Sequence, residues 1–386
     1  MTELSKLDKL KHFQDQYHKS EFIHINNAGL QPTCKPARDR AVYWANRFYE
    51  EGYYADQDYL DELESVRKKL AGFISCESGE VSFYTSTAGA VNQVAFSIGL
   101  KKDDEVLMWD QEYGSHLYPW QAACDQASAK LIQVVSEKNY ATPTDKLLAA
   151  ITAKTKVIAF SWVQYVCGAR MDDIQMLVRI AKEKNILVFV DVIQGLGLHP
   201  CDLWKWGVDG VMGGSHKWML SPIGVGYLAL RSKLIAQVKP HNVGTYTYGT
   251  CDDPSSMVCV PKKDSAKYEP GSKQVFQITA LGAAIDLITN TTVEVIEAES
   301  LRLAKKLRLG LMDQGYSLLT PFTGEKIHSS PFININVGKR TETFDQLKEK
   351  LKQNKINFAL RGGGIRFTPQ AFNTDVEIEK VLSVLK

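Results

Sequence analysis

An aspartate and a lysine are the residues of this chain whose positions favour chemistry most strongly. Asp191 lies at the end of the apolar run Ile186–Val190, and Lys217 follows the small, polar stretch Gly213–His216. Ligands of open α/β sheets bind beyond the carboxyl ends of the strands, so an aspartate there could face a ribose, a metal or a cationic heterocycle. A desolvated lysine has a lowered pKa, and its amine becomes a nucleophile. Each residue alone is more typical of a surface ion pair.

The two residues together indicate a specific cofactor. An acid at one strand end, followed by a lysine after the next strand, suits a cofactor whose aldehyde bonds to the lysine and whose ring nitrogen binds the acid. That cofactor is pyridoxal phosphate. Its phosphate needs a cradle, and the small residues at 85–92 (TSTAGAVN) begin a helix-like run. Backbone N–H groups at a helix start bind anions, although an ordinary helix cap without a ligand also explains these residues.

Alternating strand and helix patterns must position this chemistry. Strands are predicted at 105–109, 131–135, 157–161, 186–191, 210–213 and 224–230. The run 173–184 has helical apolar spacing, with Asp172 as its predicted N-cap and Lys182 near its end. Strands that are continuously apolar are typical of a sheet covered on both faces. The order predicts an α/β fold, a mostly parallel sheet sandwiched by helices.

The chain is long enough for two domains, because single cores stop growing at roughly 250–300 residues. We expect a large domain at 20–275, and a smaller α+β domain built from 1–19 and 276–386. The C-terminal part has predicted helices at 280–311, 343–353 and 374–386, and predicted strands at 332–337 and 364–368. A long loop is predicted at 250–273, and a helix within 1–20.

Composition argues against several classes of protein. Lys+Arg exceed Asp+Glu by only 46 − 44 = 2, so no basic excess is present to neutralise nucleic-acid phosphates. No run reaches the roughly 18 apolar residues of a membrane helix, and the N-terminal residues lack the apolar centre of a secretion signal. The seven cysteines form no C-x-x-C pair, which argues against a disulfide framework or a zinc site. We expect a cytoplasmic protein that binds neither nucleic acid nor membranes.

The motifs and their order resemble a known family. INNAGLQP (25–32), the Asp191–Gln194 and Ser215–Lys217 stretches, and IRFTPQAFNT (365–374) resemble class V aminotransferases. These belong to the fold type I group of pyridoxal-phosphate enzymes, with cysteine desulfurases, isopenicillin N epimerase-like proteins, kynureninases and C–S lyases. The resemblance implies that Lys217 forms the internal aldimine and that Asp191 pairs with the pyridine nitrogen. It implies that Gln194 hydrogen-bonds the phenolic oxygen of the ring.

Further cofactor contacts follow from the same resemblance. Thr87, the Ala88 amide and the hydroxyl of Ser215 would bind the phosphate, and His216 would help to position the cofactor or its phosphate. The segment YEPGSK (268–273) is similar to one whose hydroxyl reaches the phosphate of the neighbouring subunit, with Ser272 in that place. This implies a homodimer with active sites at the interface.

The resemblance also assigns the ring face and the substrate contacts. Tyr113 would stack on the ring where desulfurases carry histidine, and Gln164 would lie near the phenolic oxygen and the substrate. Asn27 resembles a substrate-contacting residue near the entrance. The planar guanidinium of arginine suits a substrate carboxylate. The epimerase- and kynureninase-like pattern favours Arg366 for this role, whereas the desulfurase pattern places an arginine nearer Arg361.

The implied activity is carbanion chemistry at the Cα of an amino acid, with the lysine as base, and the family makes a class V aminotransferase the first interpretation. The alternatives are cysteine desulfurase-like or C–S lyase activity, epimerisation, and a non-catalytic protein that binds the cofactor. Desulfurases need a mobile cysteine that follows a C-terminal arginine, and this chain has no cysteine after Cys259. That absence disfavours a persulfide route.

Overall fold

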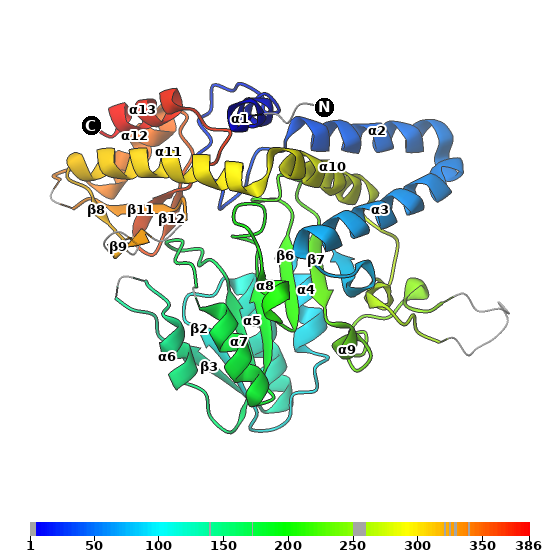
Figure 1. Cartoon of the computed structure of the whole chain (residues 1–386). Helices are drawn as coiled ribbons and strands as arrows, with labels where there is room; N and C mark the ends of the chain where they lie inside the picture. The colour runs from blue at the N-terminus through cyan, green and yellow to red at the C-terminus, as the bar shows by residue number, and fades with distance from the viewer. Residues whose placement is uncertain are drawn as a thin grey trace.

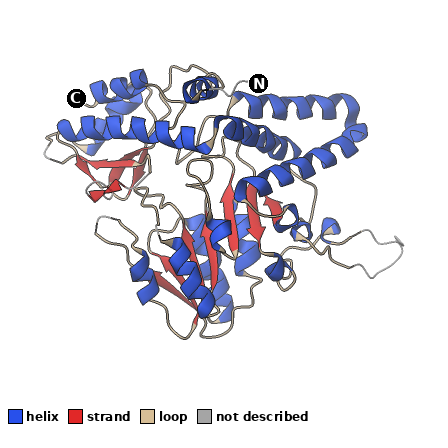
Figure 2. Cartoon of the chain, viewed as in Figure 1, coloured by secondary structure: helices blue, strands red, loops and turns tan. Residues whose placement is uncertain are grey.

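The computed structural model describes residues 5–138, 140–171, 173–249, 260–319, 322–323, 326–327, 330–338 and 340–386. A large sheet fills the lower part of the view in Figure 1, and a smaller sheet lies at the upper left beneath α11 (Val293–Asp313). The strands of the large sheet run between helices, as Figure 2 shows by colour. Both chain ends lie on the upper side of the molecule in this view (Figure 1).

The bounds of the elements are as follows. The large sheet contains β1 (Val81–Tyr84), β2 (Glu105–Trp109), β3 (Lys130–Val134), β4 (Thr155–Ser161), β5 (Leu187–Asp191), β6 (Gly210–Gly214) and β7 (Gly226–Leu230). The other strands are β8 (Ser317–Leu318), β9 (Phe322–Thr323), β10 (Lys326–Ile327), β11 (Ile333–Asn336), β12 (Ala359–Arg361) and β13 (Gly364–Phe367). The remaining helices are α1 (Lys6–Gln14), α2 (Lys35–Glu51), α3 (Asp56–Ile74), α4 (Thr87–Ala95), α5 (Gly114–Ala127), α6 (Thr144–Ala149), α7 (Ile174–Glu183), α8 (Leu203–Trp206), α9 (Ser232–Ile235), α10 (Val275–Thr291), α12 (Phe344–Gln353) and α13 (Asp375–Val384).

The large sheet has the strand order β1-β7-β6-β5-β4-β2-β3. The strands from β6 to β3 are parallel, whereas β7 is antiparallel to both β6 and β1. This confirms the predicted α/β fold with its mostly parallel sheet. The sequence analysis missed β1, a four-residue edge strand, and it began β7 two residues too early, at 224.

Alternating side chains of the strands enter two apolar cores. In β2, Val106 and Met108 pack with α4, α5 and α9, while Leu107 and Trp109 join the core that also contains α3, α7 and α10. Both faces of the sheet are therefore covered. This double burial explains why the central strands read as continuous apolar runs.

The helix predicted at 173–184 is α7, and Lys182 lies in its last turn. The predicted N-cap, Asp172, lies outside the described residues. Asp173 precedes the helix in a left-handed conformation (φ 55°), and its side chain caps nothing. The single helix predicted at 280–311 is two helices, α10 and α11, because Thr292 (φ 76°) interrupts the run.

A second unit lies at the C-terminal end of the chain. Its antiparallel sheet has the order β12-β13-β11-β8, and α11, α12 and α13 share with it a separate apolar core that includes Ile25. The strands and helices predicted after residue 330 are confirmed to within two residues at every end. The exact domain division at 20–275 stays a prediction; α10 packs against α2 and α3 rather than joining this second core.

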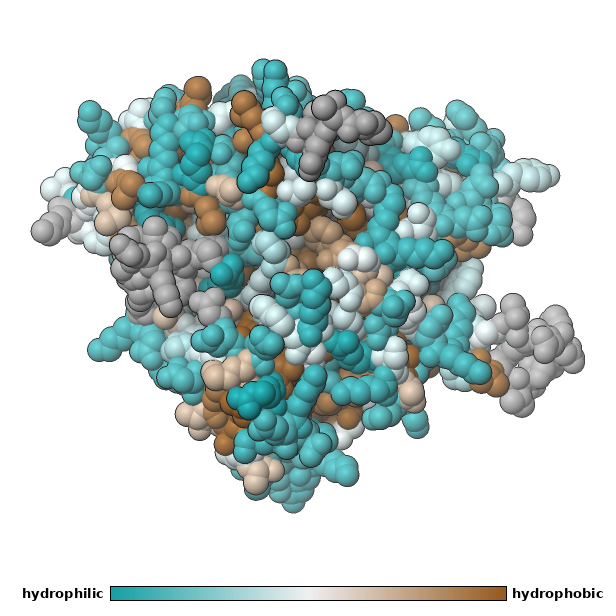
Figure 3. Space-filling view, in the orientation of Figure 1, coloured by the Kyte–Doolittle hydropathy of each residue, from teal (hydrophilic) through white to brown (hydrophobic). Residues whose placement is uncertain are grey.

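The face of the molecule in Figure 3 is mostly hydrophilic, with smaller hydrophobic areas between charged side chains. None of the helices in the described ranges combines the length and apolar character that a membrane span requires.

A buried ion pair ties the YEPGSK segment to the sheet. Glu269 accepts hydrogen bonds from Arg67 (2.6 Å) and from the backbone N–H of Phe83 in β1 (2.7 Å), and its side chain is only 2% exposed. Burial alone would raise the pKa of Glu269, but the charges and hydrogen bonds of Arg67 and Lys273 outweigh it and lower that pKa. The glutamate of this motif therefore has a structural role.

Glu269→Gln should lower the free energy of unfolding by about 3 kcal/mol, because it leaves the buried Arg67 without its main counter-charge. Glu64→Gln is the matched control: Glu64 also bonds Arg67 but is 57% exposed, so its loss should cost less than about 1 kcal/mol. Denaturant unfolding measures both. Since the pKa of Glu269 is lowered on folding, its contribution is present above its ordinary value of 4.5 and is lost as the pH falls below it. Equal losses in the two variants would contradict this assignment.

Candidate active site

A cavity of about 230 Å³ opens at the carboxyl ends of β5 and β6. Its walls also come from the start of α4, the segment before and at the start of α5, and the β12–β13 hairpin. The lining residues are Ala28, Gly29, Ser86, Thr87, Tyr113, Ser115, Tyr165, Asp191, Ile193, Gln194, His216, Lys217, Arg361 and Arg366. The structure thus brings eight of the residues chosen from the sequence, Thr87, Tyr113, Asp191, Gln194, His216, Lys217, Arg361 and Arg366, into one space.

Lys217 and Asp191 are both withdrawn from water at the floor of this cavity, with exposures of 8% and 3%. Burial lowers the pKa of Lys217 to about 8, and the nearby Asp191 carboxylate only partly opposes this. Burial likewise raises the pKa of Asp191, against the charges of His116 and Lys217 and a hydrogen bond from the Ile193 amide (2.9 Å). The amine of Lys217 is therefore far easier to deprotonate than that of an exposed lysine.

The start of α4 fits a phosphate. The Ser86 hydroxyl accepts from the Gly89 amide (3.2 Å), and the hydroxyl of Thr87 is buried without a partner. The amides of Thr87 and Ala88, in the first turn of α4, have no carbonyl partner within the helix, so they are available to an anion. A side chain at Gly214 would lie 2.9 Å from the Thr87 hydroxyl, and one at Gly226 would collide with the Ser86 backbone. These positions must therefore stay small for the cradle to exist.

Two aromatic rings form one wall. Tyr113 is 47% exposed, and its ring centroid lies 5.6 Å from the Nζ of Lys217. Tyr165 meets it edge-on, with 5.2 Å between centroids and an interplanar angle of 72°. A flat heterocycle attached at Lys217 could lie against Tyr113, as the sequence analysis predicts.

Hydrogen bonds fix Gln194, a polar side chain that lines the cavity beside Asp191. The amide of Gln194 donates to the Ala28 carbonyl (2.9 Å) and accepts from the indole N–H of Trp218 (3.0 Å). Both bonds fix its orientation beside Asp191. His216 also lines the cavity, and burial, followed by the charge of Lys217, lowers its pKa to about 4. His216 is therefore neutral at physiological pH.

Both candidate arginines enter the cavity. Arg366 is 1% exposed; it donates to the Tyr165 carbonyl and to the Asn26 side chain (3.2 Å). Burial, and then the charge of Arg361, lowers the pKa of Arg366 to about 9. The guanidinium of Arg361 lies 5.9 Å from the centroid of Tyr165. The sequence left open which of the two arginines binds the substrate carboxylate, and the structure places both in the cavity.

The other predicted residues do not line the cavity. Gln164 is buried and donates to Glu112 (3.0 Å), Ser215 donates to the Pro222 carbonyl (2.9 Å), and Asn27 donates to the Thr368 carbonyl (2.7 Å). Ser272 is exposed on the segment before α10. Their roles stay predictions. Ala88 is the second residue of α4 and lines a neighbouring hollow rather than this cavity.

A buried pair next to Asp191, Glu112 and His116, has no role assigned to it from the sequence. His116 is fully buried, and its Nδ1 lies 3.0 Å from Glu112, which also accepts from the amide (2.8 Å) and hydroxyl (2.5 Å) of Ser161. Although burial opposes it, the bond and charge of Glu112 raise the pKa of His116, whose Nε2 has no partner. Because Ser161 pairs with Asp191 in the sheet, this network lies directly behind the carboxylate. The i, i+4 spacing of Glu112 and His116 at a helix start was the available signal.

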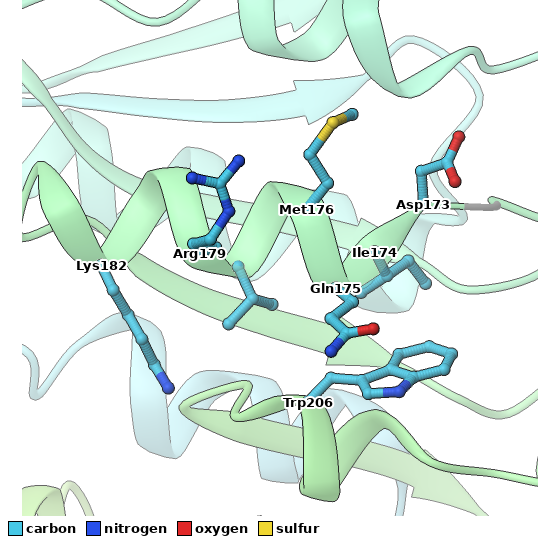
Figure 4. Close-up of a pocket in the computed structure, with 8 residues that line it drawn as sticks. Asp173, Ile174, Gln175, Met176, Arg179, Lys182 and Trp206 are labelled. Atoms are coloured by element: carbon cyan, nitrogen blue, oxygen red, sulfur yellow. The ribbon is translucent and has the colours of Figure 1, made fainter.

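A larger hollow of about 700 Å³ lies on the outer surface between α7 and Trp206 (Figure 4). Gln175 lies beside the Trp206 indole there, and Lys182 projects from the helix on the side where Trp206 lies (Figure 4). Arg179 is exposed and pairs with Glu183 (3.1 Å). No buried titratable side chain lines it among the described residues, so the smaller cavity is the candidate site.

Comparisons with known proteins agree with this site and fold. The model of the family Aminotransferase class-V matches residues 42–372. A probable cysteine desulfurase of Methanothermobacter thermautotrophicus is 26% identical over 64% of this chain, although the match spans only 60% of that protein. An uncharacterized aminotransferase of Bacillus subtilis, YcbU, is 24% identical over 97% of both chains.

Solved structures show the same fold. The cysteine desulfurase CsdA of Escherichia coli superposes with a TM-score of 0.85 at 17% identity, covering 97% of both chains. A C-DES variant with glycine covalently linked to its pyridoxal-phosphate cofactor gives a TM-score of 0.86 at 17% identity, over 94% of this chain and 96% of that one. The fold and the buried lysine–aspartate site define a fold type I enzyme.

The chain belongs to the class V aminotransferase family. The predicted family, the enzyme class and the pyridoxal-phosphate cofactor are thereby confirmed at the level of the family.

In cofactor-free protein, the amine of Lys217 should titrate at about 8 rather than near its ordinary value of 10.5, because burial disfavours its charged form. Competitive acetylation across a pH series, read by mass spectrometry, measures this. Lys205 is the control, since it is exposed and Asp202 raises its pKa. Asp191→Asn should move the Lys217 midpoint to still lower pH, since it removes an attractive anion. A midpoint near 10.5 would contradict the assignment.

Glu112→Gln should lower the pKa of His116, because the neutral amide no longer favours the imidazolium. NMR titration of the histidine rings, with His116 assigned by its own substitution, measures the change. Glu297→Gln is a matched control, because Glu297 accepts a bond from the buried His199 (2.7 Å) elsewhere in the fold. The titration of His116 should not respond to that control, and an unchanged titration in Glu112→Gln would show that the pair does not govern its charge.

Proposed function

We propose that this enzyme is a class V aminotransferase that acts on a small amino acid through a cofactor held at Lys217. One observation carries the proposal: a desolvated lysine, a buried aspartate and two arginines converge on a single cavity. When bound, pyridoxal phosphate supplies an aldehyde that bonds to an amino group and an electron-poor ring that accepts electron density from Cα.

The residues of the chain would bind the cofactor and the substrate and would transfer the proton. An anionic Asp191 would hold the ring nitrogen protonated, and the positive charge of His116 favours that anion. Thr87 and the first amides of α4 would hold the phosphate. Arg366 would bind the substrate carboxylate with two N–H groups. The amine of Lys217, with its pKa near 8, accepts the Cα proton and returns it near neutral pH.

Desulfurase activity by way of a protein thiol has little support in the described residues. None of the cysteines described there (Cys34, Cys76, Cys124, Cys167 and Cys201) lines the cavity, and burial raises the pKa of each thiol to about 11 or 12. Such thiols are poor nucleophiles. Cys251 and Cys259 lie outside the described residues.

We also propose a homodimer in the cytoplasm. The support is the exposed position of Ser272, outside the cavity of its own chain, where the family places a hydroxyl that serves the neighbouring subunit. The unpaired cysteines of the described ranges suit a reducing compartment.

Lys217→Ala should reduce turnover of amino acids by at least about 10²-fold, since it removes the base. Borohydride reduction followed by mass spectrometry should place the cofactor on the peptide that contains Lys217, and this label should vanish in the variant. Lys205→Ala, at an exposed lysine on α8, is the control. Full turnover in Lys217→Ala would overturn the proposal.

The stoichiometry of the product decides the reaction type. A transaminase given an amino acid alone should form about one equivalent of keto acid per site and then stop until a keto acid acceptor is added. Continuous release of ammonia and sulfide from cysteine or cystine would instead identify the C–S lyase alternative.

A further inference from the structure

We infer that this site recognises a short dicarboxylic amino acid, with Arg366 on the α-carboxylate and Arg361 on a second anionic group of the side chain. The inference rests on the proposed function for the chemistry of the site and deepens it by naming the substrate class. It is based on the two arginines, which line the cavity and are not paired with a carboxylate among the described residues.

Among the residues that the structure describes, neither guanidinium is paired with an acidic side chain. Within the part of the chain that the structure describes, no carboxylate lies within 4.0 Å of Arg361 or Arg366. Asp191 is the sole acid among the lining residues, and it faces the ring nitrogen in the proposed chemistry. Other arginines of the fold are neutralised, as Arg67 is by Glu269 (2.6 Å) and Arg302 by Asp375 (2.7 Å).

Both arginines also keep unused donors. The Nε groups of Arg361 and Arg366 are buried without a partner. Their remaining bonds go to neutral groups, including the Leu360 carbonyl for Arg361 (2.8 Å) and the Asn26 side chain for Arg366. Arg366 is desolvated and Arg361 is half-buried, and a buried donor without a partner is costly unless an acceptor binds it. Each arginine can therefore take one anionic group.

The hairpin sets the distance between the two anionic groups. In the β12–β13 ladder Ala359 faces Arg366, and Arg361 faces Gly364. Arg361 therefore lies on the same face as Arg366, as its diagonal neighbour about 7–8 Å away. The two-residue turn at Gly362 and Gly363, with φ of 56° and 78°, closes this hairpin tightly.

The position of Arg361 is fixed from several sides. Its carbonyl accepts from Asn334 (3.0 Å), and the Gly362 carbonyl accepts from the Tyr140 hydroxyl (3.0 Å). The ring of Tyr165 lies beneath its guanidinium. The diagonal offset of about 7–8 Å between the two arginines favours a second anionic group on a short side chain, as in aspartate, glutamate or cysteine sulfinate, within a cavity of about 230 Å³.

The test uses two four-carbon ligands that cannot react, succinate with two carboxylates and butyrate with one. Calorimetric titration of the holoenzyme should show that succinate binds at least about tenfold more tightly, since the second carboxylate gains charge-assisted hydrogen bonds. Arg361→Gln should remove most of this preference, whereas Arg366→Gln should weaken both ligands. Arg361→Lys, which keeps the charge without the fork, should retain part of the preference, and Arg179→Gln, at an exposed arginine, should leave it unchanged.

Equal binding of succinate and butyrate to the wild-type protein would overturn the inference. So would an equal weakening of both ligands in Arg361→Gln, because it would mean that both arginines hold one carboxylate. Failure of the proposed function is separately visible. If the preference for succinate depends on Arg361 but no amino acid is turned over, the aminotransferase proposal fails while the dicarboxylate site stands. If neutral amino acids are turned over and succinate is not preferred, the dicarboxylate site fails while the aminotransferase proposal stands.

Discussion

The site depends on the exclusion of water from the amine of Lys217 and the neighbouring carboxylate of Asp191. Lys217 and Asp191 stand at the ends of neighbouring strands, and every layer of the large unit helps to exclude water from them. Two apolar cores cover the sheet on both faces, and Trp218, directly after the lysine, is fully buried against the amide of Gln194. Without this cover, the pKa of Lys217 would lie near its ordinary value of 10.5 rather than about 8, and far less of its amine would be in the neutral, nucleophilic form near neutral pH.

Burial lowers the pKa of Lys217 and raises that of Asp191, so it favours the neutral form of each group. Their mutual attraction, the charge of His116 and the hydrogen bond from the Ile193 amide to Asp191 restore part of the charged state. The Glu112–His116 pair therefore matters for the site, although neither residue lines the cavity. A cationic ring nitrogen placed against Asp191 would compensate the same buried carboxylate, so the protein provides in advance the field that such a ring needs.

The sequence was sufficient for the fold because the central strands are short runs of five to seven residues separated by helical periodicity. It was also sufficient for Lys217 and Asp191, since Asp191 ends one apolar strand and Lys217 follows the small, polar turn after the next. It could not place Arg361, because its neighbour across the hairpin depends on the register of β12 and β13, which two glycines with positive φ determine. It gave no role to His116, because a lone histidine gives no sign of burial. The edge strand β1 was too short for its pattern to be recognised, yet Glu269 anchors it through Phe83.

The two halves of the site come from parts of the chain with separate cores. The lysine, the aspartate and the phosphate cradle stand on the large sheet, whereas both arginines stand on a hairpin whose residues pack with α11, α12 and α13. The groups proposed to transfer protons are consequently fixed independently of the groups proposed to recognise the substrate. Under that proposal, changes in the hairpin would alter which anion is held without disturbing the buried lysine. The register of one short hairpin would then set the substrate, while the strands of the large sheet hold the groups proposed for the chemistry.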